Sequence, residues 1–173
     1  MHLSVSNVRE QNRNTSYPRR VSIETPEELA QATKFDHIAA LMQGNKRSSG
    51  NFIEADCIIL DIDNTHSEDP DNWVTLKDVE EAFPGVPFYA VQSRNYMKVK
   101  SKKDNAGNDI YFEAREKWHL YFPLSRTITT SDEYEKLIKD AARLFPFFDE
   151  GALDIAHFLY GVKEPQVEYY DGD

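Results

Sequence analysis

The sequence has little of several features that define other classes of protein. A single cysteine, Cys57, among 173 residues excludes an internal disulfide framework and a zinc site built from several cysteines. No apolar run is long enough to span a membrane, and the polar N-terminus lacks the apolar core of a signal peptide. Internal repeats are also missing. We therefore expect a globular, cytoplasmic protein with no membrane partner and no zinc.

Positive charge is scarce overall but concentrated in one part of the chain. The formal net charge of −10 argues against nucleic acid as a partner when taken alone. Between residues 94 and 126, however, eight Lys or Arg face only four acids, whereas eleven acids face four bases between residues 132 and 173. This distribution is compatible with a basic patch on an acidic body and equally with a solvated loop.

Helix-like and strand-like segments alternate along the chain, which predicts an α/β or α+β domain. Helices are expected where an N-cap residue precedes an apolar stripe: after Thr25 through residue 42, after Thr75 to residue 83, and from Ser131 to residue 145. Strands are expected in "LSVSNV", "CIILDID", "PFYAVQS", "KWHLYFPL" (closed by Pro123) and "PQVEYY", with hairpin-turn composition in "SKKDNAGND".

Two aspartates, Asp61 and Asp63, follow the apolar run of "CIILDID". On a strand, residues two apart point to the same face, roughly 6–7 Å from each other. Two such carboxylates repel unless a cation lies between them, and hard oxygen ligands favour Mg²⁺ or Mn²⁺. An EF-hand is excluded because His66 stands where its glycine is required. The alternative is an acidic turn with no ligand.

Two enzyme families share this pattern of carboxylates. "IILDIDNT" resembles the signature of the haloacid dehalogenase-like phosphatases, which implies Asp61 as nucleophile, Asp63 as acid/base and Thr65 in its motif position. That resemblance leaves "KWHLYFPL" unexplained and places some sixty residues before a motif that usually opens its domain.

The chain also resembles the archaeo-eukaryotic primase superfamily, specifically phage and plasmid primase-polymerases, from about residue 45 to the C-terminus. "FIEADCIILDIDN" is similar to the first motif, "KWHLYFPL" to the second with His119 as its histidine, and "ALDIAHFLYG" to the third with Asp154 as the last metal ligand. Asp149, in "FFDEG", is interpreted as part of a turn. We favour this resemblance because three motifs occur in the family's order.

The resemblance implies an α+β primase-polymerase catalytic core, with a small N-terminal α/β lobe and an RRM-like mixed sheet flanked by helices. Residues 1–173 would form one catalytic domain of two packed lobes, the N-terminal part of a longer replication protein. Two Mg²⁺ or Mn²⁺ ions, about 3.5–4 Å apart, would be held by Asp61, Asp63 and Asp154. His119 would contact the phosphates of the incoming nucleotide.

Further polar residues are candidate contacts to nucleotide or template. The set comprises Ser93, Arg94, Asn95, Lys98, Lys100, Lys117, Arg47 and His157. Two departures from the family pattern stand out: Tyr96 occupies a position where relatives often have a histidine, and His157 a position where an arginine is expected. Each basic residue taken alone is also compatible with an ordinary solvated surface.

The function implied is template-directed nucleotidyl transfer, as a DNA primase, a DNA polymerase or both. Single-stranded or primed DNA and nucleoside triphosphates would be its partners, with a fused or separate helicase, in the cytoplasm of a prokaryotic host that carries the phage or plasmid. Without a zinc element, the grip on template would come from the basic insert or from other domains. Two alternatives stay open: a phosphatase, and a non-catalytic module that binds single strands.

Overall fold

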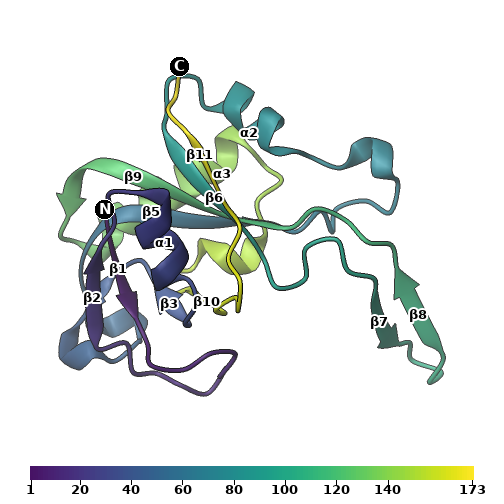
Figure 1. Cartoon of the computed structure of the whole chain (residues 1–173), viewed down its shortest axis with the longest axis horizontal. Coiled ribbons are helices and arrows are strands. Elements are labelled where there is room, and N and C mark those ends of the chain that lie inside the picture. The colour runs from purple at the N-terminus through teal and green to yellow at the C-terminus, as the bar shows by residue number, and fades with distance from the viewer.

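The largest sheet contains five strands, and every neighbouring pair is antiparallel in this computed structural model, which describes residues 1–173 (Figure 1). In spatial order the strands are β11 (Val167–Tyr170), β6 (Phe88–Gln92), β9 (Trp118–Ile128), β5 (Phe52–Ile62) and β4 (Leu41–Met42). Strands β5 and β6 run in the same direction with β9 between them. The unit of β5, α2 and β6 is therefore a split βαβ arrangement.

A second sheet of four strands is built mainly from the N-terminal part of the chain. Its order is β10 (Phe158–Leu159), β3 (His37–Ile38), β1 (His2–Val5) and β2 (Arg19–Ser22). Because β10 comes from near the C-terminus, it attaches the N-terminal sheet to the third predicted motif. A separate hairpin of β7 (Lys100–Lys103) and β8 (Asp109–Phe112) projects from the body of the protein, as the predicted turn requires (Figure 1).

Three α-helices and four short 3₁₀ turns complete the chain. They are α1 (Pro26–Ala32), α2 (Leu76–Ala82) and α3 (Ser131–Leu144), with turns η1 (Gln43–Asn45), η2 (Ser49–Asn51), η3 (Pro70–Asn72) and η4 (Glu150–Leu153). Capping boxes at Thr25 and Thr75 start α1 and α2, as predicted. The N-cap of α3 is Thr130, one residue before the predicted Ser131. No helix is long and apolar enough to cross a membrane.

Two expectations about elements were wrong. Helix α1 was predicted to run to residue 42, but it ends at Ala32, and the apolar residues that follow form β3 and β4. Strand pairing with distant segments overrides the local helical periodicity of these residues. Pro123 was predicted to close its strand, but β9 continues through it to Ile128. Pro123 pairs with Cys57 beside an irregularity in the register of β5 and β9, the kind of position at which a sheet tolerates proline.

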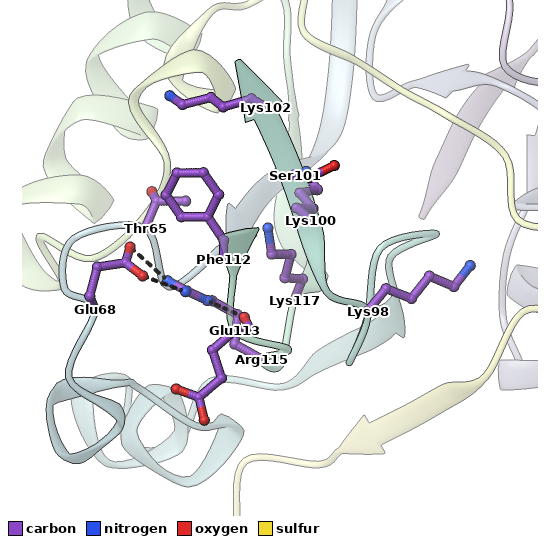
Figure 2. A pocket seen from close by; sticks show the side chains of 10 residues that line it. All are labelled: Thr65, Glu68, Lys98, Lys100, Ser101, Lys102, Phe112, Glu113, Arg115 and Lys117. Carbon is purple, nitrogen blue, oxygen red and sulfur yellow. Dashed lines mark hydrogen bonds and ion pairs between the residues drawn. The ribbon is translucent and has the colours of Figure 1, made fainter. Parts of the chain in front are cut away.

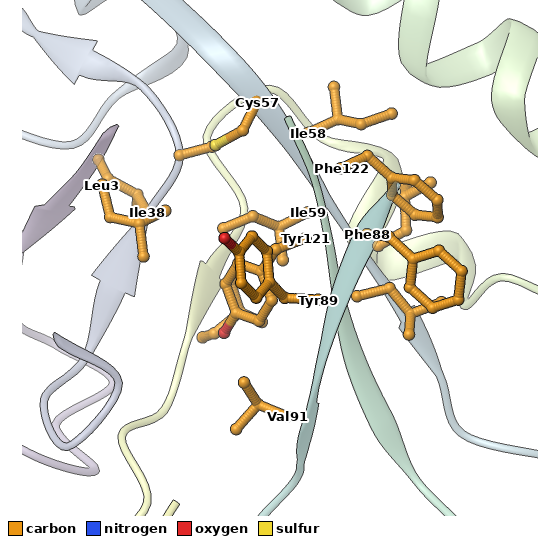
Figure 3. Close-up of a cluster of buried hydrophobic side chains, with 14 of the residues drawn as sticks. Leu3, Ile38, Cys57, Ile58, Ile59, Phe88, Tyr89, Val91, Tyr121 and Phe122 are labelled. Atoms are coloured by element: carbon orange, nitrogen blue, oxygen red, sulfur yellow. The ribbon is translucent and has the colours of Figure 1, made fainter. Parts of the chain in front are cut away.

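Alternation along the strands gives the central sheet two apolar faces (Figure 3). Cys57, Ile59 and Tyr121 point towards the N-terminal sheet, where they meet buried residues such as Leu3 and Ile38. Ile58, Phe88 and Phe122 point to the opposite face, which α2 and α3 cover. A single cluster of 34 buried residues joins the two sheets and the helices. The class is therefore α+β, as expected.

Candidate functional site

The two aspartates lie at the end of β5, on the face of the central sheet that the N-terminal sheet covers. Asp61 is opposite His119 of β9, and His119 in turn is opposite Val91 of β6. Because side chains alternate, Asp61 shares the face of Cys57 and Ile59, so it is only 8% exposed. The register of the strands thus brings the first and second predicted motifs into direct contact.

The third carboxylate of the site is Asp149 rather than the predicted Asp154. The backbone N–H of Asp149 donates to the carbonyl of Asp61 at 2.8 Å, which docks this segment against the end of β5. Carboxylate oxygens of Asp61, Asp63 and Asp149 lie within 4.8 Å of one another. Asp154 is exposed, and its carboxylate instead accepts the N–H of Ala156 at 2.8 Å. The interpretation of Asp149 as a simple turn residue was therefore incomplete.

The carboxylate cluster has the properties of a cation site. Oxygen Oδ1 of Asp61 is buried and has no hydrogen-bond partner, while Oδ2 lies 3.2 Å from Nε2 of His157. Burial raises the pKa of Asp61, but the nearby histidines, His119 first, outweigh it and hold this pKa below its usual value. Burial, Asp61 and Asp149 together raise the pKa of Asp63. Buried carboxylates that repel each other, with one oxygen unpartnered, fit a divalent ion with hard oxygen ligands.

Most of the predicted site residues line one cleft of about 310 Å³, here called the carboxylate cleft. Its polar lining consists of Asp61, Asp63, Ser93, Arg94, Asn95, Lys100, His119 and His157. The residues come together because β5 and β6 run in the same direction and end at the same edge of the sheet. Phe158 and Leu159 of β10, with Tyr160 directly after them, form the remaining wall. Residues as far apart in sequence as 61 and 157 thus share one site.

Two histidines, His119 and His157, and one arginine, Arg94, line the cleft with the carboxylates. Desolvation keeps the pKa of His119 below its usual value even though Asp61 opposes the shift. His119 is therefore neutral at pH 7, with one N–H to donate. The guanidinium of Arg94 lies 4.2 Å from the ring centre of Tyr160 and 3.0 Å from the carboxylate of Glu10. These contacts hold Arg94 at the mouth of the cleft.

Four predicted contacts lie outside the carboxylate cleft. Lys98 and Lys117 line a neighbouring cleft under the β7–β8 hairpin, and Asp154 caps a turn. Arg47 was predicted to contact phosphate, but it lies 4.5 Å from the ring centre of Phe158 and donates to the carbonyl of Ala156 at 3.2 Å. Arg47 therefore supports the wall of the cleft from behind and does not line the cleft itself.

The residue that replaces the family's expected histidine is not part of the carboxylate cleft. Tyr96 packs edge-on against Trp118, with 5.1 Å between ring centres, and its hydroxyl donates to Glu116 at 3.5 Å. The histidine that lines the cleft beside Asp61 is His119, its partner on the neighbouring strand.

The loop that follows the aspartates is held by two residues that the sequence analysis did not single out. Asn64 adopts a left-handed conformation (φ 52°), donates to Val74 and Glu116, and accepts the N–H of Val74 at 2.8 Å. Arg115, only 2% exposed, donates to the carbonyl of Asn64 at 2.9 Å and pairs with Glu68 at 2.9 Å. An asparagine directly after a strand is a turn signal, but nothing local identifies Arg115 as its partner.

A buried histidine behind the carboxylate cleft joins the two sheets. Nδ1 of His37 lies 2.8 Å from the carbonyl of Phe35, and Nε2 lies 2.6 Å from the hydroxyl of Tyr121. Because a carbonyl can only accept, Nδ1 carries the proton, and Nε2 accepts from Tyr121. Burial lowers the pKa of His37 to about 4. The two sheets are therefore linked by a neutral histidine.

Comparisons with known proteins returned no relative for this chain. No protein-family model matches it, no curated protein does, and neither does any solved structure. The interpretation of the carboxylate cleft consequently depends on its geometry and on the motif resemblance given above.

Proposed function

We propose that this protein is a nucleotidyltransferase that extends a nucleic-acid strand on a template, as a primase, a DNA polymerase or both. The observation that carries the proposal is the carboxylate cleft itself. Asp61 and Asp63 line this cleft together with Lys100, Arg94 and His119. Asp149 completes a cluster of three carboxylates, and one oxygen of Asp61 is buried and unpartnered. Carboxylates that bind divalent ions and cations that bind phosphates, side by side in one cleft, are the groups that a metal-bound polyphosphate requires.

Asp61, Asp63 and Asp149 would hold the divalent ions, Mg²⁺ or Mn²⁺. When bound, such ions promote ionisation of the attacking 3′-hydroxyl and stabilise charge on the pyrophosphate leaving group. The chain's own residues bind and orient the nucleotide. Lys100 and Arg94 supply cations for the triphosphate, and neutral His119 supplies a hydrogen-bond donor from the floor of the cleft. Positioning and electrostatic stabilisation then account for the rate.

The arrangement of the central sheet supports the primase-like proposal over the phosphatase alternative. The split βαβ unit places β9, with His119, between β5 and β6, as an RRM-like sheet would. A phosphatase would need an accessible nucleophile, but Oδ1 of Asp61 is buried and Oδ2 faces His157. Thr65, the last residue of the phosphatase signature, lines the neighbouring cleft instead of the carboxylate cleft.

Primer extension tests this proposal directly. The wild type, with a primed DNA template, nucleoside triphosphates and Mn²⁺, is compared with an Asp61→Ala/Asp63→Ala variant. The matched control is Asp71→Ala/Asp132→Ala, which removes two exposed carboxylates that do not line the cleft. We expect extension by the wild type and the control, and only background extension by the cleft variant, with circular dichroism confirming that all three are folded.

Three results would contradict the proposal. Extension that survives in Asp61→Ala/Asp63→Ala would mean that the carboxylates are not part of the reaction. No extension by the wild type, together with metal-dependent release of phosphate from an aryl phosphate, would favour the phosphatase. If neither reaction occurs but single strands bind equally to wild type and variant, the non-catalytic module is the better description.

A further inference from the structure

A second cleft, of about 320 Å³, lies between the β7–β8 hairpin and the loop after the aspartates, and we call it the hairpin cleft (Figure 2). Its lining is unusually basic for a chain with a net charge of −10. The lining includes five cations and one aromatic ring: Lys98, Lys100, Lys102, Arg115, Lys117 and Phe112.

Most of these cations lack a carboxylate partner. Arg115 is the exception, because it pairs with Glu68 and holds the loop that forms the opposite wall. The four lysines of the hairpin cleft form no ion pair within 4.0 Å, whereas Lys103, on the outside of the same hairpin, pairs with Asp109 at 2.7 Å. An acidic protein thus leaves four cations unpaired in one cleft, which indicates an anionic ligand.

Lys117 is the most informative of the four. It is 6% exposed, lines the hairpin cleft and lies beside Lys100 (Figure 2). Burial, followed by Lys100, lowers the pKa of Lys117, and Asp63 opposes this shift only in part. A cation that is buried against another cation costs free energy unless an anion compensates it. The hairpin cleft therefore has a built position for a negative group.

Two features distinguish a nucleic-acid strand from a simple anion. Phe112 of β8 presents its ring to the cleft, with the ammonium of Lys102 5.3 Å from the ring centre, so an aromatic face and a cation lie side by side. Single-strand binding proteins combine a cationic groove with rings on which unpaired bases stack. Lys100 lines both the hairpin cleft and the carboxylate cleft, so the two clefts adjoin at this residue.

We propose that the hairpin cleft binds the phosphodiester backbone of a single-stranded nucleic acid, with a base stacked on Phe112, and leads the strand past Lys100 to the carboxylate cleft. The destination of the strand rests on the proposed function, but the binding itself does not. Single strands are favoured over duplexes because Phe112 can stack only on a base whose face is free.

Fluorescence anisotropy of a labelled oligothymidine, titrated with protein in EDTA at several salt concentrations, tests this inference. The test variant is Lys98→Ala/Lys102→Ala, which leaves Lys100 and the carboxylate cleft intact. The matched control is Lys77→Ala/Lys103→Ala, which removes two exposed, ion-paired lysines outside the cleft. Both variants change the net charge equally, and thermal unfolding shows whether each remains folded.

We expect the test variant to bind about 25-fold more weakly at 0.1 M salt and to lower the slope of log K against log salt by about 1.4, since each single-strand phosphate contact contributes about 0.7. The control should match the wild type. Phe112→Leu should weaken binding about fivefold or more without changing the slope, because it removes stacking and no charge.

Three outcomes would overturn the inference: equal losses in test and control variants, tighter binding of a duplex than of oligothymidine, or equal competition by polyglutamate. Because binding is measured without metal, failure here is distinguishable from failure of the proposed function. Strand binding with the expected slopes but no primer extension would contradict only the nucleotidyl transfer. Primer extension with binding indifferent to Lys98 and Lys102 would contradict only the hairpin cleft.

Discussion

The carboxylate cleft and the hairpin cleft share Lys100, yet they hold their charges in opposite ways. In the carboxylate cleft, short side chains are fixed by strand register and by a backbone hydrogen bond, as between Asp149 and Asp61. In the hairpin cleft, the exposed side chains of Lys100 and Lys102 extend from a hairpin that projects from the body, and they lack ion-pair partners (Figures 1 and 2). One cleft is therefore rigid and the other adaptable.

The difference corresponds to what each cleft would bind. A divalent ion requires oxygen ligands at fixed short distances, so its carboxylates must be held by the fold. A nucleic-acid backbone slides and offers many equivalent phosphates, so flexible point charges on lysines are sufficient for it. Four experiments test this contrast, in order of decreasing expected effect. The first concerns the buried contact between His37 and Tyr121 behind the carboxylate cleft.

The link between the two sheets at His37 should make the fold sensitive to acid. The folded-state pKa of about 4 lies below the ordinary value of 6.5, so the stability that neutral His37 contributes is present above pH 6.5 and is lost as the pH falls towards 4. We expect a loss of about 3 kcal/mol over that interval. Denaturant unfolding at several pH values measures it, and His37→Gln should flatten this part of the profile. Parallel profiles for both proteins would contradict the assignment.

The loop between the clefts should depend strongly on Asn64. Asn64→Ala removes three buried hydrogen bonds and places alanine at φ 52°, so we expect a loss of about 2 kcal/mol or more of unfolding free energy. Asn64→Gly relieves the backbone strain but not the lost hydrogen bonds, and should recover part of that loss. Equal destabilisation by the two variants, in urea unfolding, would show that backbone conformation is unimportant at this position.

Metal binding should discriminate between the observed and the predicted third carboxylate. Asp149→Asn should weaken Mn²⁺ binding about tenfold, because it removes a ligand from the cluster. Asp154→Asn should weaken it much less, because the Asp154 carboxylate caps the N–H of Ala156. Titration calorimetry with Mn²⁺ measures both. The reverse order would mean that the segment around η4 rearranges when metal binds.

The sequence predicts the elements of this fold better than it predicts their partners. Capping residues locate the starts of α1 and α2, and the length and branching of "CIILDID" identify β5. Where local signals compete with pairing, prediction fails: the residues after Ala32 have helical periodicity but join strands. Such pairings depend on chain segments far away, for example β10 beside β3, which no local pattern encodes.

The candidate site shows the same division. Asp61 and His119 could be singled out from the sequence because each is a polar residue within a largely apolar strand. Asp149 was missed because its role depends on a loop that docks against Asp61 through the backbone, and turn composition conceals this. The place of Arg47 behind the cleft wall could not be predicted, because a basic residue before the first motif gives no sign of its contacts with Phe158 and Ala156. Sequence patterns identify chemistry on regular elements more readily than on loops.

The smallest predicted effect concerns Asp63, whose substitution should stabilise the metal-free protein. Because burial, Asp61 and Asp149 raise the pKa of Asp63, its ionised form destabilises the metal-free fold at neutral pH, and stability is gained as the pH falls through the raised pKa. Asp63→Asn should therefore raise the unfolding free energy in EDTA by up to about 1 kcal/mol. Lys98→Ala/Lys102→Ala, on the adaptable side of the contrast, should change it by less than about 0.5 kcal/mol.

Adding Mn²⁺ should reverse the order of the two proteins. The wild type gains stability in proportion to the logarithm of metal concentration over its dissociation constant, whereas Asp63→Asn has lost a ligand and gains less. Thermal unfolding with and without Mn²⁺ measures both effects. A variant that is less stable than the wild type in EDTA would mean that Asp63 has a stabilising partner in the fold. The carboxylate cleft would then be a structural charge cluster, and the contrast with the hairpin cleft would disappear.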